Sequence, residues 1–186
     1  MVITLKRFVL DACTIYLGTV TDPTNLEGLT ELGLTNGGVN VNIVPDVREI
    51  EFDGKRGRRI KDMSRVLGYE VSVETKGLEI NEEILALSLI KKDTSETVTG
   101  YTKFIPNNSI EYKDLVIVGQ MHGSKPMVVI LKNCVNEEGF ALETSDSSEG
   151  TFTLKAFANY NYDPIADVNG TNNAPVVIYV PEEKQV

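Results

Sequence analysis

The chain has 186 residues, 41% of them hydrophobic and 24% charged, with 18 basic against 27 acidic residues. A soluble chain of this length can bury roughly 70% of its unfolded surface in one core, so we expect a single domain over residues 1–186. The formal net charge of −9 argues against a general nucleic-acid-binding protein, because neutralising phosphates requires a basic surface. No stretch approaches the ~20 consecutive apolar residues of a membrane-spanning helix, so we expect no contact with a membrane.

The first clear element is an alternating strand that follows a Gly-Gly turn. Its sequence GGVNVNIV places apolar residues on one side and polar residues on the other: Val39, Val41 and Ile43 against Asn40 and Asn42. A period of two residues is typical of a strand with one face on a core and the other in water. Residues 37–54 therefore predict a strand longer than the usual five or six residues.

The apolar side of this strand changes in its second half. It continues through Val47 and then shifts to Ile50 and Phe52, and such a shift requires an extra residue. We therefore predict a β-bulge or bend near residues 48–49. Pro45 has no N–H to donate, so we place it at a sheet edge or a bulge.

A second alternating strand returns over residues 63–77. Its apolar or aromatic residues take the odd positions and its polar residues the positions between, namely Leu67, Tyr69, Val71 and Val73 against Glu70, Ser72 and Glu74. The two strands predict a long hairpin that overshoots its own core. Such a ribbon leaves its edges and both faces open to water, which invites pairing with another chain.

The connection between these strands is strongly basic. Residues 54–65 contain one acidic residue and six basic ones, which are Lys55, Arg56, Arg58, Arg59, Lys61 and Arg65. One interpretation is a solvated loop, and another is an arm that contacts a neighbouring subunit. Residues 133–186 contain nine acidic and two basic residues, so head-to-tail self-association is electrostatically favourable. A nucleic-acid clamp is disfavoured because interleaved aromatic residues for base stacking are missing.

One helix is predicted over residues 81–90, NEEILALSLI. Asn81 can cap its first turn, and Glu82 and Glu83 suit the positive end of the helix dipole. Its apolar stripe consists of Ile84, Leu85 and Leu89. The alternation in LALSLI keeps a strand open as the alternative.

The second half of the chain returns to strands. Residues 91–100 are polar and predict a loop. Further strands are predicted within residues 114–121, 125–133, 139–146, 150–163 and 174–183. Many short strands with one helix predict an all-β sandwich or small barrel.

The sequence gives little support for conventional catalysis. Cys13 and Cys134 fit no metal-ligand spacing, and His122 is the only histidine. No phosphate-binding, dinucleotide-binding or nucleophile-elbow motif is present, and Glu137 with Glu138 reads as an ordinary acidic turn. We expect no enzyme, and therefore neither catalytic residues nor a metal site nor a cofactor.

The order and spacing of these features resemble the major tail tube proteins of tailed bacteriophages. The similarity covers roughly residues 30–165. A Gly-Gly turn leads into the long strand, IEFDG opens a hairpin with a basic loop, and an alternating strand and one helix follow. It continues through the segments LKNC and GFALE to a final strand that ends in YDP.

This resemblance implies a β-barrel or β-sandwich subunit with a long hairpin arm that forms hexameric rings. The rings would stack into a hollow tube around a tape measure protein, meet other tail proteins, and conduct phage DNA into the host without specific binding. The protein would belong to the virion and would be assembled in the host cytoplasm. Related folds form the inner tubes of contractile tails, phage-like bacteriocins and type VI secretion needles.

The resemblance also implies roles for two sets of residues. The hairpin would reach the adjacent ring or subunit, through Lys55, Arg56, Arg58 and Arg59. The polar residues best placed to face the channel are Asn40, Asn42, Glu70, Ser72 and Glu74. Because DNA carries one charge per ~1.7 Å of axis, a carboxylate-rich lining would repel it and prevent sticking. The alternative is that these residues face bulk solvent outside the tube.

A β-sandwich binding module for carbohydrate or a receptor, on a virion or cell surface, is the rival hypothesis. Such modules usually present exposed aromatic residues in loops. Tyr160 and Tyr162 are the one candidate pair of aromatic residues for such a loop. We expect them to pack in a terminal strand instead.

Overall fold

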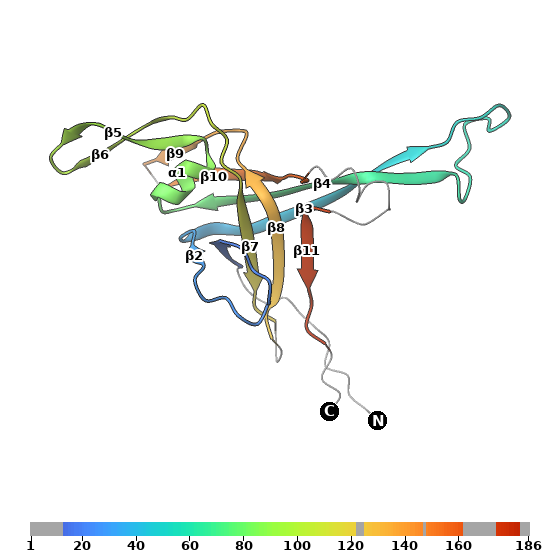
Figure 1. Cartoon of the computed structure of the whole chain (residues 1–186), viewed down its shortest axis with the longest axis horizontal. Coiled ribbons are helices and arrows are strands. Elements are labelled where there is room, and N and C mark those ends of the chain that lie inside the picture. Colours follow the sequence, from blue (N-terminus) through green and yellow to red (C-terminus); the bar gives the residue numbers. More distant parts are fainter. Residues whose placement is uncertain (1–12, 122–124, 147, 162–173, 183–186) are drawn as a thin grey trace, which may run out of the picture.

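The computed structural model describes residues 13–121, 125–146, 148–161 and 174–182. Within these ranges the chain is mostly β-sheet with one short helix, as the sequence predicts (Figure 1). One antiparallel sheet has the strand order β2-β1-β7-β8-β10-β4-β3, with β11 also paired to β8 and β9 also paired to β10. A separate hairpin consists of β5 and β6. No helix in the described part of the chain has the length and hydropathy to cross a lipid bilayer.

The strands of the large sheet are β1 (Thr14–Leu17), β2 (Thr30–Glu31), β3 (Thr35–Glu49), β4 (Ser64–Gly77), β7 (Lys113–Gly119), β8 (Met127–Val135), β9 (Ala141–Ser145), β10 (Ser148–Ala158) and β11 (Val176–Tyr179). The separate hairpin pairs β5 (Ile90–Val98) with β6 (Tyr101–Pro106), and the helix α1 spans Glu82–Leu87. The predicted strands of the second half are therefore present, with bounds that differ by a few residues.

The core lies between the two halves of the large sheet. Ile15 of β1 and Leu131 of β8 share one buried cluster with Val73 of β4 and Leu154 of β10. β8 and β10 pair at only two positions, Val135 with Phe157 and Cys134 with Ala158. The sheet can therefore turn at this narrow junction, and β7 and β8 run steeply across β3 and β4 (Figure 1).

Helix α1 closes one end of this core. The side chain of Asn81 accepts a hydrogen bond from the Ile84 N–H at 2.9 Å, which caps the first turn as predicted. Ile84 and Leu87 are fully buried. The helix ends at Leu87, earlier than the predicted residue 90, because Leu89 has a positive φ of 59° and β5 begins at Ile90.

The loop predicted at residues 91–100 is wrong, because most of this stretch belongs to the β5–β6 hairpin. Lys103 forms ion pairs with Asp93 and Glu96, both at 3.0 Å. Hydrogen bonds from Ser95, together with Lys103, lower the pKa of Asp93 to about 2. The hairpin projects from one end of the molecule (Figure 1), so most residues of β5 are polar although its backbone is extended.

Candidate functional site

The β3–β4 ribbon is the most extended feature of the molecule, and its two halves differ in burial (Figure 1). Near the body, Val71 and Val73 of β4 are buried, and Val41 and Ile43 of β3 pack against the same core. We call residues 44–68 the arm. Its apolar residues are exposed, from Val44 on β3 to Leu67 on β4. The long strands predicted from alternation are therefore present, and their outer halves leave the core.

A bulge lies within the arm, close to its base. Asp46 pairs with Gly68, but the next residue, Val47, pairs with Val66, so Leu67 is an extra residue on β4. The sequence predicted this shift on the first strand at residues 48–49. The structure places it slightly earlier and on the opposite strand, so Leu67 does not continue the buried face and is 54% exposed.

Pro45 lies on the edge strand of the sheet, as expected, because β3 has β4 as its only described neighbour. It pairs with Tyr69. The Tyr69 N–H points toward β10 rather than toward β3 and donates to the Tyr160 hydroxyl at 2.7 Å. No ladder hydrogen bond is therefore lost at the proline.

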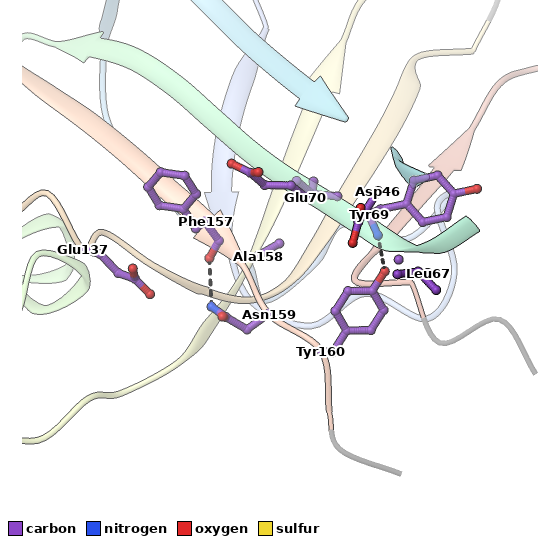
Figure 2. A pocket seen from close by; sticks show the side chains of 11 residues that line it. Asp46, Leu67, Tyr69, Glu70, Glu137, Phe157, Ala158, Asn159 and Tyr160 are labelled. Atoms are coloured by element: carbon purple, nitrogen blue, oxygen red, sulfur yellow. Dashed lines mark hydrogen bonds between the residues drawn. The ribbon is translucent and has the colours of Figure 1, made fainter. Parts of the chain in front are cut away.

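Tyr160 ties the base of the arm to the end of β10 (Figure 2). A hollow of about 620 Å³ opens beside this contact. Three carboxylates, those of Asp46, Glu70 and Glu137, line it together with Tyr69, Phe157 and Tyr160. Tyr160 was expected to pack in a terminal strand, and instead it follows β10 and remains partly exposed. Its expected neighbour Tyr162 lies outside the described residues.

The tip of the arm is organised around Lys55. Its side chain is only 4% exposed, and its ammonium group pairs with Glu49 at 2.6 Å and Glu51 at 2.7 Å. These hydrogen bonds, that of Glu49 first, raise the pKa of Lys55, and the hydrogen bond from Lys55 lowers the pKa of Glu49. Arg59 pairs with the same Glu49 at 3.1 Å. Two of the four predicted contact residues are therefore engaged within the tip itself.

The other two predicted contact residues, Arg56 and Arg58, are exposed. Neither forms an ion pair with any residue that the structure describes. Arg56 and the nearby Gly54 and Gly57 have positive φ angles of 51°, 93° and 69°. The Arg58 N–H donates to the Lys55 carbonyl at 3.1 Å. The turns that enclose Lys55 thus leave two free guanidinium groups at the end of the arm.

The predicted channel residues share one face of the ribbon. Asn40 pairs with Glu74 and Asn42 with Ser72 across the two strands, and Glu70 stands opposite Val44. Side chains directly opposite each other lie on the same face of a sheet. The other face carries the buried Val71 and Val73. The structure therefore brings the five residues together, on the face directed away from the core.

The same face also carries two lysines that the sequence prediction did not include among the channel residues. Lys155 of β10 stands opposite Glu74, forms an ion pair with Glu138 and lies 5.3 Å from the centre of the Phe157 ring. Lys76 of β4 pairs with Glu143 at 3.4 Å. The sequence could have predicted Lys155 on this face, since it occupies a polar position in the alternating segment TFTLKAF. A carboxylate contacts each lysine, while Glu70 and Glu74 form no ion pair with a described residue.

The polar face belongs to a four-stranded section of the sheet, β9-β10-β4-β3. One row of residues paired across adjacent strands runs through all four strands, from Leu142 through Phe152 and Gly77 to Thr35. Within the described residues, β3 has no strand on its outer side and β9 pairs only with β10. Unpaired N–H and C=O groups along such edges can extend a sheet into another chain.

The cysteine thiols are poorly suited to nucleophilic chemistry. Burial raises the pKa of Cys134 to about 12 and also raises that of Cys13, which suppresses the reactive thiolate at neutral pH. His122 lies outside the described residues. In the part of the chain that the structure describes, no three His, Cys, Asp or Glu side chains are grouped to hold a metal ion.

Comparison with protein-family models gives no match for this chain, and comparison with curated proteins gives none either.

Proposed function

We propose that this protein is a non-enzymatic structural subunit that assembles with copies of itself into hexameric rings and stacks them into the hollow tail tube of a tailed bacteriophage. The observation that carries this proposal is the arm. It continues the β3–β4 ladder beyond the core and exposes apolar side chains on a regular, hydrogen-bonded ribbon. Contiguous exposed apolar surface on an ordered element is typical of a protein–protein contact.

Ring closure would use the open edges of the four-stranded section. If each of six subunits contributes four strands at ~4.8 Å spacing, the wall has about 24 strands. With strands tilted ~45°, the backbone diameter is on the order of 50 Å. The outer edge of β3 in one copy would meet the β9 side of the next. The core face of each section would remain inside its subunit, and the polar face would line the channel.

The charges of the polar face suit the passage of DNA. Glu70 and Glu74 form no ion pair with a described residue, although both interact electrostatically with Lys155, while Lys76 and Lys155 are paired with Glu143 and Glu138. DNA would therefore meet an uncharged or repulsive wall rather than free cations. In this proposal a tape measure protein occupies the channel during assembly, other tail proteins cap the tube, and the subunit resides in the virion.

Electron microscopy of the purified chain tests the proposal. We expect negatively stained rings or tubes at high protein concentration, and light scattering that increases with concentration. Monodisperse monomers under all ionic strengths would contradict it. Since the predicted wall has a defined size, rings with a bore far from the estimate above would reject the 24-stranded arrangement even if the chain assembles.

The hollow beside Tyr160 favours a second candidate function, binding of carbohydrate or a receptor. It combines the aromatic residues Phe157 and Tyr160 with carboxylates that can accept hydrogen bonds from hydroxyl groups. A glycan array probed with monomeric protein tests this function. Binding that is lost in Tyr160→Ala would support it, whereas an array without any signal would reject carbohydrate as its ligand.

A further inference from the structure

The arm carries apolar side chains that no other described part of the chain covers. Val47 and Val66 form a cross-strand pair beyond the core, and each is 49% exposed. Further apolar side chains follow toward the tip, and they are exposed as well: Ile50, Phe52, Ile60 and Met63. The ladder closes with the Ile50 N–H donating to the Met63 carbonyl at 2.8 Å, so this surface sits on an ordered ribbon.

The opposite end of the molecule also exposes apolar side chains. β3 begins and β4 ends there, far from the tip along the long axis (Figure 1). Leu34, Ile80 and Leu142 are each at least half exposed. All three belong to the same end of the sheet. Leu142 starts the row of paired residues that ends at Thr35, three strand spacings or about 14 Å away, and the Leu78 N–H, two residues before Ile80, donates to the Leu34 carbonyl. We call this surface the sheet end.

Two adjoining hollows shape the sheet end. One of about 450 Å³ and one of about 360 Å³ share Asn36, Gly37 and Lys76 in their linings. Gly37 and Gly38 are extra residues on β3, because Asn36 pairs with Lys76 and Val39 already pairs with Thr75. Both glycines have positive φ, and a Cβ at either would meet open space. The chain therefore leaves a recess beside the β9–β10 turn.

The two ends carry opposite charge. The tip segment, residues 54–65, has six basic residues and one acidic residue. Residues 76–83, 141–146 and 148–151, which form the sheet end, contain six acidic residues and one basic residue. Three of these carboxylates already pair with lysines of the same chain: Glu82 with Lys92, Glu83 with Lys113 and Glu143 with Lys76. Arg56 and Arg58 at the tip have no ion-pair partner among the described residues. Neither do Asp146, just after β9, and Glu149, near the start of β10.

We infer that the sheet end is the acceptor for the arm of a second copy. In this arrangement, which rests on the proposed function, exposed apolar side chains of the arm, which lie on both faces of the ribbon, cover Leu34, Ile80 and Leu142. Arg56 and Arg58 approach the carboxylates of Asp146 and Glu149. Donor and acceptor surfaces are different and lie at opposite ends of one molecule. Each copy can therefore use both at once, and the contact repeats as an open stack.

A charge-swap experiment on the full chain tests this inference. Arg56→Glu with Arg58→Glu reverses the donor, and Asp146→Arg with Glu149→Arg reverses the acceptor; Glu143 is left unchanged because it already binds Lys76. Each double variant places like charges together, so we expect its critical concentration for stacking to rise about tenfold or more. The fourfold variant restores opposite charges, and its critical concentration should return to within about threefold of the original chain.

The matched control reverses two exposed carboxylates elsewhere, Glu27→Arg with Glu182→Arg, and should stack like the original chain. Loss of stacking in both double variants without recovery in the fourfold variant would overturn the acceptor assignment and leave the proposed function standing. Failure of the unmodified chain to form rings or tubes would overturn both.

If a reversed variant does not fold, judged by circular dichroism, cysteine cross-linking provides the test. Arg58→Cys and Glu149→Cys are made as separate chains, mixed and oxidised. A dimer that forms only in the mixture supports the contact. Equal cross-linking of each variant with itself overturns it, because the two positions would then not be opposed across the interface.

Discussion

The inner and outer halves of the β3–β4 ribbon have the same backbone pairing and different surroundings. In the inner half, Val71 and Val73 are buried against β10, β7 and β8. In the outer half, Val47 and Val66 pair across the same two strands and remain about half exposed. A ladder of hydrogen bonds is therefore sufficient to continue the strands, but the side chains are buried only where other strands pack against the ribbon.

This difference in burial predicts that the inner half contributes to folding and the outer half to the proposed assembly. Buried apolar area supplies most of the free energy of folding, so the inner half should determine the stability of the single chain. The outer half has no such burial to lose in the monomer. Its apolar side chains can contribute free energy only when another molecule covers them, so substitutions there should act on association.

The largest expected effect comes from the core beside the inner half. Leu154 of β10 is 1% exposed. Leu154→Ala removes buried methyl groups and leaves a cavity, so we expect the free energy of unfolding to fall by about 2–5 kcal/mol. Urea denaturation followed by circular dichroism measures this change. A loss below about 1 kcal/mol would break the proposed division, because the inner half would then not depend on its core.

A smaller effect is expected where α1 closes the same core. Asn81 accepts from the Ile84 N–H and donates to the Leu32 carbonyl at 3.1 Å. Asn81→Ala removes both bonds and should reduce the free energy of unfolding by about 1 kcal/mol. Asn81→Ser, which restores the cap but cannot reach as far, should recover part of the loss. Equal losses in the two variants would assign the effect to the Leu32 bond alone.

The outer half should respond differently to the same kind of truncation. Val66→Ala removes apolar surface that is already half exposed, so we expect a change in the free energy of unfolding within about 0.5 kcal/mol. The concentration needed for assembly should nevertheless rise. Sedimentation velocity at several concentrations, beside the denaturation curve, separates the two effects. A clear loss of monomer stability would show that the arm already packs against something in the single chain.

The smallest expected effect on global stability is at the tip, and it depends on pH. The lowered pKa of Glu49 means that its ion pair with Lys55 stabilises the tip above the ordinary value of 4.5 and is lost as pH falls below it. Lys55→Met should shift this transition in the amide resonances of the tip to higher pH, since only Arg59 then remains beside Glu49, while leaving the unfolding midpoint of the body unchanged. Arg56→Met, which removes no ion pair among the described residues, should preserve the transition.

Alternation predicted the parts of the ribbon that depend on period alone. Asn40, Asn42, Ser72 and Glu74 share a face because residues two apart in a strand point the same way, and no tertiary information is needed for that. The cap at Asn81 was similarly local. These predictions succeeded because short-range geometry decides them.

The failures have a different origin. Residues 91–100 were predicted as a loop because they are polar, but a hairpin that is largely exposed to solvent has no need of an apolar side. Its threonines have good strand propensity, and that signal was outweighed by polarity. Lys55 was grouped with the exposed basic residues, because the glycine turns that fold it back onto Glu49 and Glu51 are visible only in three dimensions.

The extra residue Leu67 also sets where the tip can reach. A bulge bends a ribbon and increases its local twist, so this position acts as a pivot. The nine residues 46–54 span up to roughly 30 Å when extended, and at that radius each degree of rotation displaces the far end by about 0.5 Å. Deleting Leu67 would straighten the pivot without touching the core, and in the proposed stack the rotation between successive copies would then change.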